Sequence, residues 1–345
     1  MCINNILCPR CFSKNLYRFG KNKLGHQKYQ CKQCARQFSP DSNPNKNKRP
    51  YPKCPVCNSG TYLHHDYLYY SRFKCNSRKC NHIHIQLKKT SNFDDISSDF
   101  KSKTINIKRL RTNINVVIDA LYMYFVHSAT TRAISQYLLD RKNIKISHVS
   151  IYKWIKGFGG IFKDIVSKYT PQNLNLSDEW HVDETVIKIK GKRYYIWTLI
   201  DSETRYVIDW YLTTSREATS AFHLFDKVKK RFGAPQSIVS DRLPSYNIPT
   251  KLVFSESKHI KVQSWYDEVT NNLIESFFKR FKHKYRTTHG LKCETSVNAL
   301  LEGFFFFYNY IMPHKGLSNL TPAKVAGVES VSYTHLRAHE TDSYL

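Results

Sequence analysis

Two cysteine quartets near the N-terminus have the spacing of metal ligands. They are Cys8, Cys11, Cys31 and Cys34, and then Cys54, Cys57, Cys75 and Cys80. Two cysteines separated by two residues can place both thiolates on one tetrahedral ion, and a second pair closes the site. We therefore expect one structural Zn²⁺ in each quartet, which supplies folding energy that such short hairpins lack. In the second quartet, His82 or His84 could replace Cys80 as the fourth ligand. Free cysteines are the disfavoured alternative, because both quartets have the spacing of zinc sites.

Three carboxylates occupy positions that favour chemistry. Asp183 lies within a predicted strand, Asp241 ends a short buried strand where α/β sheets place ligands, and Glu275 lies on a predicted helix. Glu275 shares its helical stripe with three cations, Lys279, Lys282 and Arg286. Taken singly, these carboxylates could be a strand-edge charge, a turn residue and half of a solvated ion pair. Their strand–strand–helix order predicts instead that they form one site.

The segments around these carboxylates predict the fold that positions them. Three β-rich runs form a predicted meander: Glu179–Ile189, Arg193–Asp201 and Arg205–Thr213. The remaining elements are a helix over 217–232, a short strand at 238–239 and a long helix over 268–285. This order is typical of an α/β ribonuclease-H-like domain with a mixed sheet.

Three short helices are predicted before this domain, over 116–127, 131–139 and 147–158, the last ended by Gly159-Gly160. One face of the third helix is apolar, and the other carries Val149, Tyr152, Lys153 and Lys156. A short helix with one packed face and one basic face suits insertion into the major groove of DNA. The segment therefore predicts a helix-turn-helix, although any three-helix unit would show such faces.

Charge and composition point to a nucleic-acid partner. The 345 residues carry 54 Lys+Arg against 27 Asp+Glu, a formal net charge of +27. Residues 1–112 contain no Glu at all, and the first Glu of the chain is Glu179. Such a basic chain is expected to bind a polyanion. Hydrophobic residues make up 41% of the chain, which excludes a generally disordered protein. No apolar run approaches the ~20 residues that a membrane-spanning helix needs. No apolar segment follows Met1, so we expect a reducing compartment.

Four motifs together resemble the insertion-sequence transposases with a DDE integrase core. They are Trp180-His181-Val182-Asp183-Glu184-Thr185, Lys188-Ile189-Lys190-Gly191, Val239-Ser240-Asp241 and Asn271-Asn272-Leu273-Ile274-Glu275. Separations of 57 residues between the aspartates and 33 between Asp241 and Glu275 are typical of that family. Tyr308-Asn309, Pro313-His314 and Thr321-Pro322-Ala323 are similar to its C-terminal segment. The resemblance covers residues 113–328, and the zinc ribbons lie outside the usual core.

The resemblance implies the chemistry of the site. Asp183, Asp241 and Glu275 would hold two Mg²⁺ (or Mn²⁺) ions, with Asp183 bridging both. The protein would bind terminal inverted repeats, cleave the element ends and join the freed 3′-hydroxyls to target DNA. Lys282 would contact a terminal phosphate, with Lys279 and Arg286 beside it. The protein is expected to act on DNA as a homodimer or higher oligomer. It is expected in the cytoplasm of a prokaryote, associated with the nucleoid and without a membrane partner.

We expect six segments in the chain. They are a zinc ribbon (1–43), a second zinc ribbon (50–90), a linker (91–112), a helix-turn-helix domain (113–170), the DDE core (178–328) and a non-native tail (331–345). The tail shows no periodicity and looks like a translated sequencing adapter, with an ordinary disordered tail as the alternative. Two other functions stay open: an inactivated element that only binds DNA, and a structure-selective nuclease such as a junction resolvase.

Overall fold

The computed structural model describes residues 6–22, 25–40, 51–88, 105, 110–171, 178–262, 271–288, 290–291 and 294–328. The chain divides into two compact units. The first comprises Met1–Asp66 and Ser71–Ile85, and the second comprises Tyr67–Tyr70 and Gln86–Leu345. The predicted tail at 331–345 and most of the 91–112 linker lie outside the described residues.

The first unit contains two three-stranded sheets. One is formed by β1 (Leu16–Lys21), β2 (Gln27–Cys31) and β3 (Gln37–Phe38), the other by β4 (Thr61–Asp66), β5 (Tyr70–Cys75) and β6 (Ile83–Leu87). The β1–β2, β2–β3 and β4–β5 pairs are antiparallel, as expected of hairpins between paired cysteines. Each of the turns at Cys8, Cys31 and Cys54 closes with a backbone hydrogen bond from the residue four positions later. Those residues, Phe12, Ala35 and Asn58, have φ of 56° to 58°, so the three turns share one conformation.

The second unit begins with three helices, α1 (Ile114–Phe125), α2 (Thr131–Lys142) and α3 (His148–Lys168). Ser147 caps the start of α3, because its hydroxyl accepts a hydrogen bond from the Ser150 amide at 3.2 Å. The predicted end of α3 at Phe158 is wrong, because the helix continues for ten more residues. Gly159 lies inside α3 and does not end it. A Cβ at this position would lie only 3.1 Å from the Cα of Ala299 on α7 (Glu294–Phe306). The glycine instead lets two helices approach closely.

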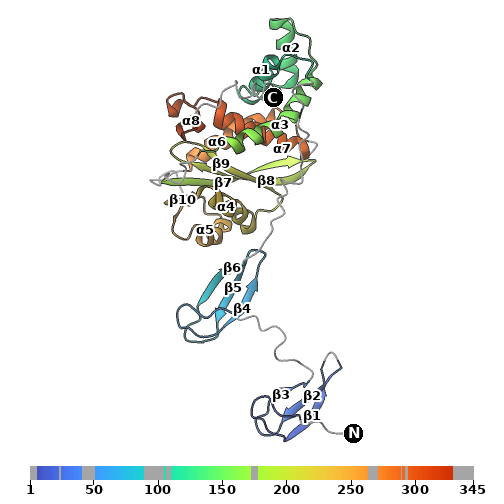
Figure 1. Cartoon of the computed structure of the whole chain (residues 1–345), viewed down its shortest axis with the longest axis vertical. Coiled ribbons are helices and arrows are strands. Elements are labelled where there is room, and N and C mark those ends of the chain that lie inside the picture. The colour runs from blue at the N-terminus through green and yellow to red at the C-terminus, as the bar shows by residue number, and fades with distance from the viewer. Residues whose placement is uncertain are drawn as a thin grey trace, which may run out of the picture. The chain divides into compact units, whose positions relative to one another are not determined.

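A five-stranded mixed sheet follows, in the order β11-β10-β7-β8-β9 (Figure 1). Its strands are β7 (Glu179–Ile189), β8 (Lys192–Asp201), β9 (Val207–Thr213), β10 (Ser237–Ser240) and β11 (Lys258–Lys261). The first three form the predicted antiparallel meander, and β10 runs parallel to both β7 and β11. The turn from β7 to β8 uses Lys190 and Gly191, both at positive φ, as tight hairpins require.

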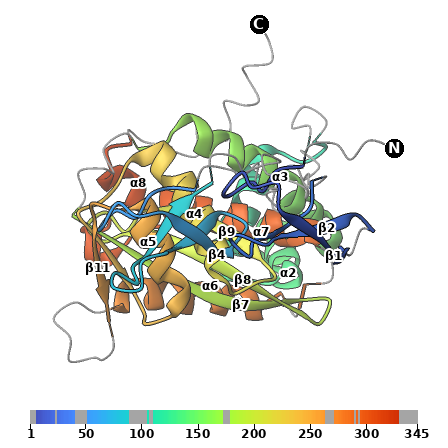
Figure 2. The same ribbon diagram turned by 90° about the horizontal axis from the view of Figure 1, so that it is seen from below.

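Helices cover both faces of this sheet. Helices α4 (Ala218–Phe232) and α5 (Asn247–Val253) lie on one face, and α6 (Asn272–Arg286) and α7 lie on the other (Figure 1). Figure 2 shows the sheet from the side that α4 and α5 cover. Short helical segments complete the unit: η3 (Pro244–Tyr246), η4 (Phe307–Ile311), η5 (Lys315–Leu317) and α8 (Pro322–Val325). The predicted start of α6 at Glu268 lies outside the described residues, and the helix ends at Arg286, one residue later than predicted.

Two of the N-terminal helices, α1 and α3, pack directly on α7 and η4. Phe162 of α3 stacks on Phe306 with ring centroids 4.7 Å apart, and Phe125 of α1 stacks on Phe307 at 4.9 Å. Gly303 makes room for the Phe125 ring, because a Cβ there would overlap it. These aromatic side chains are at most 1% exposed, so one hydrophobic core joins the three helices to the helices over the sheet. Among the described residues, no helix has both the length and the apolar character needed to cross a bilayer.

A buried lysine lies within this junction. Lys284 of α6 is 0% exposed, its ammonium lies 3.1 Å from the ring centroid of Tyr124, and it donates to the Ala129 carbonyl at 3.3 Å. Burial lowers the pKa of Lys284 to about 7, because the charged form loses its hydration. The face of Tyr124 favours the ammonium and opposes part of that effect.

This lysine makes folding stability depend on pH. Between pH ~7 and ~10.5 the unfolded chain binds a proton at Lys284 that the folded chain lacks, so stability rises with pH across this window and falls as pH drops toward 7. We expect Lys284→Met to remove this dependence, about 1.4 kcal/mol per pH unit within the window. Urea unfolding of both proteins at pH 7.5, 8.5 and 9.5 measures it, with the exposed Lys251→Met as the control. Parallel curves for wild type and Lys284→Met would contradict the expectation.

Candidate functional site

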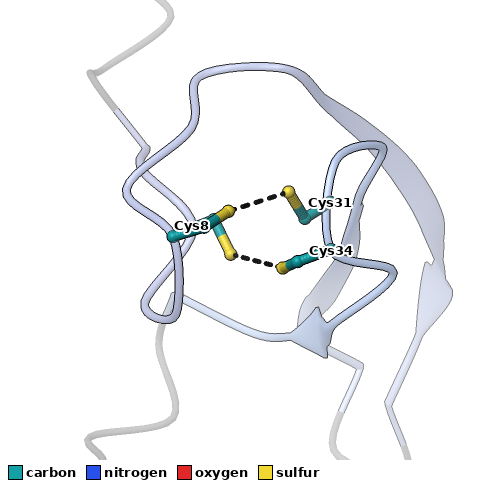
Figure 3. Close-up of side chains that lie close together, drawn as sticks. Cys8, Cys31 and Cys34 are labelled. Atoms are coloured by element: carbon teal, nitrogen blue, oxygen red, sulfur yellow. Dashed lines mark hydrogen bonds between the residues drawn. The ribbon is translucent and has the colours of Figure 1, made fainter.

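The cysteines of the first unit form two clusters with the geometry of tetrahedral zinc sites. Cys8, Cys31 and Cys34 point toward one another in the first cluster, together with Cys11 (Figure 3). Its Cys8–Cys34 and Cys11–Cys31 Sγ atoms are each 3.5 Å apart. Four sulfurs bound to Zn²⁺ at ~2.3 Å lie ~3.8 Å from one another, so the cluster fits this ion.

The second cluster consists of Cys54, Cys57, Cys75 and Cys80, with Sγ separations of 3.8 Å and 3.4 Å for its two closest pairs. Cys80 is therefore the fourth member, and His84 instead stacks its ring on Phe73. Hydrogen bonds from the hydroxyl and backbone of Ser59 lower the pKa of Cys57 to about 6, with Cys75 adding to the effect. A thiolate is the form that binds metal, so this environment prepares Cys57 as a ligand.

The register of the five-stranded sheet brings Asp241 next to Asp183. Strand β10 pairs with β7 in parallel, and its last pair joins Ser240 to Val182. Asp183 is the next residue of β7, and Asp241 directly follows the end of β10, so the two aspartates lie next to each other where the paired strands are ~4.8 Å apart. Asp241 also accepts the Leu243 amide at 2.9 Å, which fixes the turn that follows the strand.

Helix α6 brings Glu275 over the same strand. The helix is attached to β7 at both ends: Asn271 pairs with His181 at 3.3 Å, and the Tyr285 hydroxyl bonds the backbone amide and carbonyl of Lys188 at 3.0 and 3.1 Å. The other ring nitrogen of His181 contacts Glu179 at 2.8 Å. His181 is therefore a positioning residue between strand and helix.

A cavity of about 340 Å³ lies between β7 and α6. It is lined by Asp183, Glu184, Thr185, Glu275, Phe278, Lys279, Lys282 and Arg286. Five residues singled out in the sequence thus meet in one cavity: Asp183 from the strand, and Glu275 with three cations from one helical stripe. Asp241 does not line it, and neither do the predicted DNA-contact residues of α3.

The pKa of the Asp183 carboxyl is shifted by its surroundings in this site. Burial, the charge of Glu184 and smaller repulsion from Asp241 and Glu275 together raise its pKa to about 7, although the Glu184 amide opposes them by donating to Asp183 at 2.8 Å. Crowded carboxylates of this kind favour a bound cation, which would remove the repulsion. Among the described residues, only the cysteine quartets bring three or more ligand atoms within 4.8 Å of one another, so these carboxylates are more widely spaced than the thiols.

The structure also reveals a network that our sequence reasoning missed. Glu184 is 3% exposed, accepts a hydrogen bond from Arg216 Nε at 2.6 Å and another from the hydroxyl of the fully buried Tyr246. Tyr246 belongs to η3, so this network ties the segment after Asp241 to the strand of Asp183. A signal was present in the sequence: Glu184 is a charged residue on the apolar face of its strand, with Trp180 and Val182.

The predicted DNA-contact residues of α3 differ in their surroundings. Val149 is 48% exposed and Lys153 is also exposed. The Tyr152 hydroxyl pairs with Ser296 of α7 at 2.8 Å, and Lys156 lies over the Tyr152 ring at 5.6 Å. The face predicted to be free is thus partly packed against the rest of the unit.

Comparisons with known proteins match both parts of the chain. Residues 177–314 match the family model of the DDE domain of IS240-type transposases, and residues 1–35 match the InsA N-terminal domain. The transposase for insertion sequence-like element IS431mec of Staphylococcus aureus is 29% identical over 188 residues, 54% of this chain and 81% of that protein. The insertion element iso-IS1N protein InsA of Shigella dysenteriae is 50% identical over 34 residues, 10% of this chain and 38% of that protein.

Among solved structures, the HTLV-2 integrase catalytic core domain in complex with magnesium is similar, at 17% identity over 44% of this chain and 96% of that one. Its TM-score of 0.34 is too low to add to the family assignment. The family matches coincide with the two regions described above, the cysteine ribbon and the mixed sheet with its carboxylates. The chain thus carries a DDE transposase domain at residues 177–314 and an InsA-type zinc ribbon at residues 1–35, and it is similar to insertion-sequence transposases.

Proposed function

We propose that this transposase binds the terminal inverted repeats of its element, cleaves the element ends and joins the freed 3′-hydroxyls to target DNA. The observation that carries the proposal is the cavity between β7 and α6, where Asp183 and Glu275 face three cations. Carboxylates that hold metal next to cations that hold phosphate are the two components that phosphodiester cleavage requires.

Asp183, Asp241 and Glu275 are the proposed metal ligands. Carboxylate oxygens suit Mg²⁺ or Mn²⁺. Burial, with the neighbouring carboxylates, raises the pKa of Asp183, which supports a site that needs a cation. Two such ions, when bound, activate the attacking oxygen and stabilise the leaving oxyanion. The pKa of Asp183 responds to both other carboxylates, so Asp183 would hold the ions together with them. The attachment of α6 to β7 at both ends keeps Glu275 in place.

The cations of α6 are the proposed contacts for the DNA end. Lys279, Lys282 and Arg286 follow Glu275 along one stripe of the helix and line the same cavity. Lys282, two turns beyond Glu275 on this stripe, would hold the terminal phosphate, as the resemblance to DDE transposases implies. Guanidinium and ammonium groups bind phosphate strongly through charge-assisted hydrogen bonds.

Further parts of the proposal concern the N-terminal segments, the assembly and the compartment. Two structural Zn²⁺ ions occupy the cysteine clusters, one in the ribbon at 1–43 and one in the ribbon at 50–90. The linker at 91–112 connects the ribbons to a helix-turn-helix at 113–170. That helix-turn-helix reads the terminal repeats, and the core spans 178–328. The protein works as a homodimer or higher oligomer on DNA, in the cytoplasm with the nucleoid. Support comes from the net charge of +27 and from the thiol geometry.

Cleavage of a labelled element end tests the proposal. The purified protein should cut a duplex that carries the inverted repeat of its own flanking DNA, with Mg²⁺, and should join the product to a plasmid. A branched junction without the repeat is the comparison substrate, because a junction resolvase would prefer it. Binding to the repeat without cleavage would instead support an inactivated element that only binds DNA.

The exposed start of α3 is expected to contribute phosphate contacts. Lys153→Ala and Lys156→Ala should each weaken binding to the terminal repeat and reduce the slope of log K against log[salt] by ~0.9. Fluorescence anisotropy at 50–200 mM salt measures this slope. Lys230→Ala is the control, since Lys230 pairs with Asp226 on α4. Unchanged slopes for both α3 variants would move recognition to the ribbons.

A further inference from the structure

A second cavity, of about 390 Å³, lies on another face of α6. Six of its lining residues carry the argument: Arg205, Asn272, Ser276, Arg280, Tyr308 and His314. Three of them come from α6, Arg205 comes from the turn between β8 and β9, and the other two come from η4 and the segment after it. None of these side chains is part of the carboxylate cavity.

Two guanidinium groups give this cavity a positive charge that none of its lining residues balances. Within the described part of the chain, neither Arg205 nor Arg280 forms an ion pair, and no carboxylate lines the cavity. Arg280 donates only to the sulfur of Met312, at 3.5 Å. Like charges gathered in a concave site need an anion, because the surrounding protein screens them less than water does.

The buried imidazole of His314 responds to both arginines. His314 is 5% exposed, and burial, then Arg280 and then Arg205, lower its pKa to about 4, although the Tyr308 carbonyl at 3.3 Å opposes them. His314 is therefore neutral at physiological pH, and the positive charge resides on the guanidinium groups. The forked N–H donors of arginine match the oxygens of a phosphate.

Gly316 provides the space in which Arg205 lies. A Cβ at this position would come within 2.6 Å of the guanidinium carbon, so any other side chain would displace the group. Asn272 and Ser276 add an amide and a hydroxyl to the same cavity. The site thus combines two cations with neutral hydrogen-bond donors.

Helix α6 is the wall that the two cavities share. Glu275 lines the carboxylate cavity and the next residue, Ser276, lines the arginine cavity. Successive helical residues are 100° apart around the axis, so the two sites lie on adjacent faces of one helix turn. When one phosphate of a DNA strand is bound at the carboxylates, another phosphate of the same strand can therefore reach the arginine cavity near the start of α6.

We propose that the arginine cavity is a second phosphodiester site, in which Arg205 and Arg280 hold a backbone phosphate of the DNA engaged at the carboxylates. This inference rests on the proposed function. The phosphate belongs either to the element end or to the target duplex, since both present the same chemistry to the two guanidinium groups.

Three variants test the site in the full-length protein: Arg205→Gln, Arg280→Gln and Gly316→Ala. The last keeps the charge and only displaces Arg205. End binding, end cleavage and strand transfer are measured with Mg²⁺, and the exposed Lys251→Ala on α5 is the control. A loss of at least ~10-fold in end binding and cleavage assigns the phosphate to the element end. A similar loss in strand transfer alone assigns it to the target.

Neutral methylphosphonates identify the contact directly. Each backbone position of the end duplex and of the target duplex is neutralised in turn, and affinity is measured for wild type and for Arg280→Gln. At one position the substitution should weaken wild-type binding at least ~10-fold but leave the variant unaffected, which is the signature of a shared contact.

The two ideas fail in different ways. A wild-type protein that cuts and joins DNA, with variants that match it in all assays and show no coupled position, would overturn the arginine site alone. A wild-type protein that neither binds nor cuts its own element ends would overturn the proposed function. Circular dichroism and melting temperatures of the variants show whether a loss is due to unfolding, and Gly316→Ala, which removes no charged group, serves as a second probe if an arginine variant fails to fold.

Discussion

Asp183→Asn, Asp241→Asn and Glu275→Gln are each expected to abolish end cleavage and strand transfer. Each substitution keeps the shape of the side chain and removes the charge that would hold a divalent ion. The loss should exceed the roughly 10- to 100-fold that removal of an outer-shell partner causes at metal sites. The double variants should be no worse than the single ones, because residues that act as a unit give strongly non-additive effects. Cleavage and joining of a labelled end, with Mg²⁺ or Mn²⁺, measure both steps.

Binding of the terminal repeat should survive in these variants. The proposed recognition contacts lie in the ribbons and on α3, outside the cavity that Asp183 and Glu275 line. Lys282→Ala is a useful contrast, since it should weaken positioning of the end while leaving the metal dependence of cleavage unchanged. Near wild-type cleavage by Asp241→Asn would show that the metal ligands have been misassigned.

Removal of zinc is expected to unfold both ribbons. Each quartet encloses a space that fits a tetrahedral ion, and structural zinc sites contribute about 10–16 kcal/mol of apparent binding free energy at pH 7. The purified full-length protein should contain two zinc ions, Cys31→Ser and Cys75→Ser should each contain one, and the double variant none. Atomic emission measures the zinc content, and the spectrum after Co²⁺ exchange reports tetrahedral thiolate coordination.

Cys293→Ser is the matched control for the zinc experiment, because Cys293 belongs to neither quartet. It should retain two zinc ions and wild-type affinity for DNA. Chelation should lower the affinity for the terminal repeat but leave the second unit folded. The core of that unit is built from aromatic residues far from the cysteines in sequence. A folded ribbon without metal would contradict the role assigned to both quartets.

Strand periodicity allowed much of the catalytic fold to be predicted. The bounds of β7 agree with the prediction, because alternation of side chains along Glu179–Ile189 is a local property of the sequence. The start of β9 was placed two residues too early, because Arg205 adopts φ of 57° in the preceding turn. Helix caps such as Ser147 were also predictable, since they depend on neighbouring residues alone.

Features that depend on distant partners could not be predicted in this way. Gly159 was expected to end a helix, yet its role depends on Ala299 of another helix, 140 positions along the chain. Arg216 and Tyr246 converge on Glu184 only after the sheet has formed, so no local pattern links them. Arg205 and Arg280 likewise come together only through the approach of a β-turn to α6.

The length of α3 has a consequence for the geometry of the reaction. At 1.5 Å per residue, its 21 residues form a continuous rod of about 31 Å, close to the length of nine base pairs of B-form DNA. The helix packs along α7 from Tyr152, which pairs with Ser296, to Phe162, which stacks on Phe306. In the proposed function, this rigid attachment would act as a molecular ruler that sets the distance from recognition sequence to cut site, so that extra base pairs inserted between them should abolish cleavage.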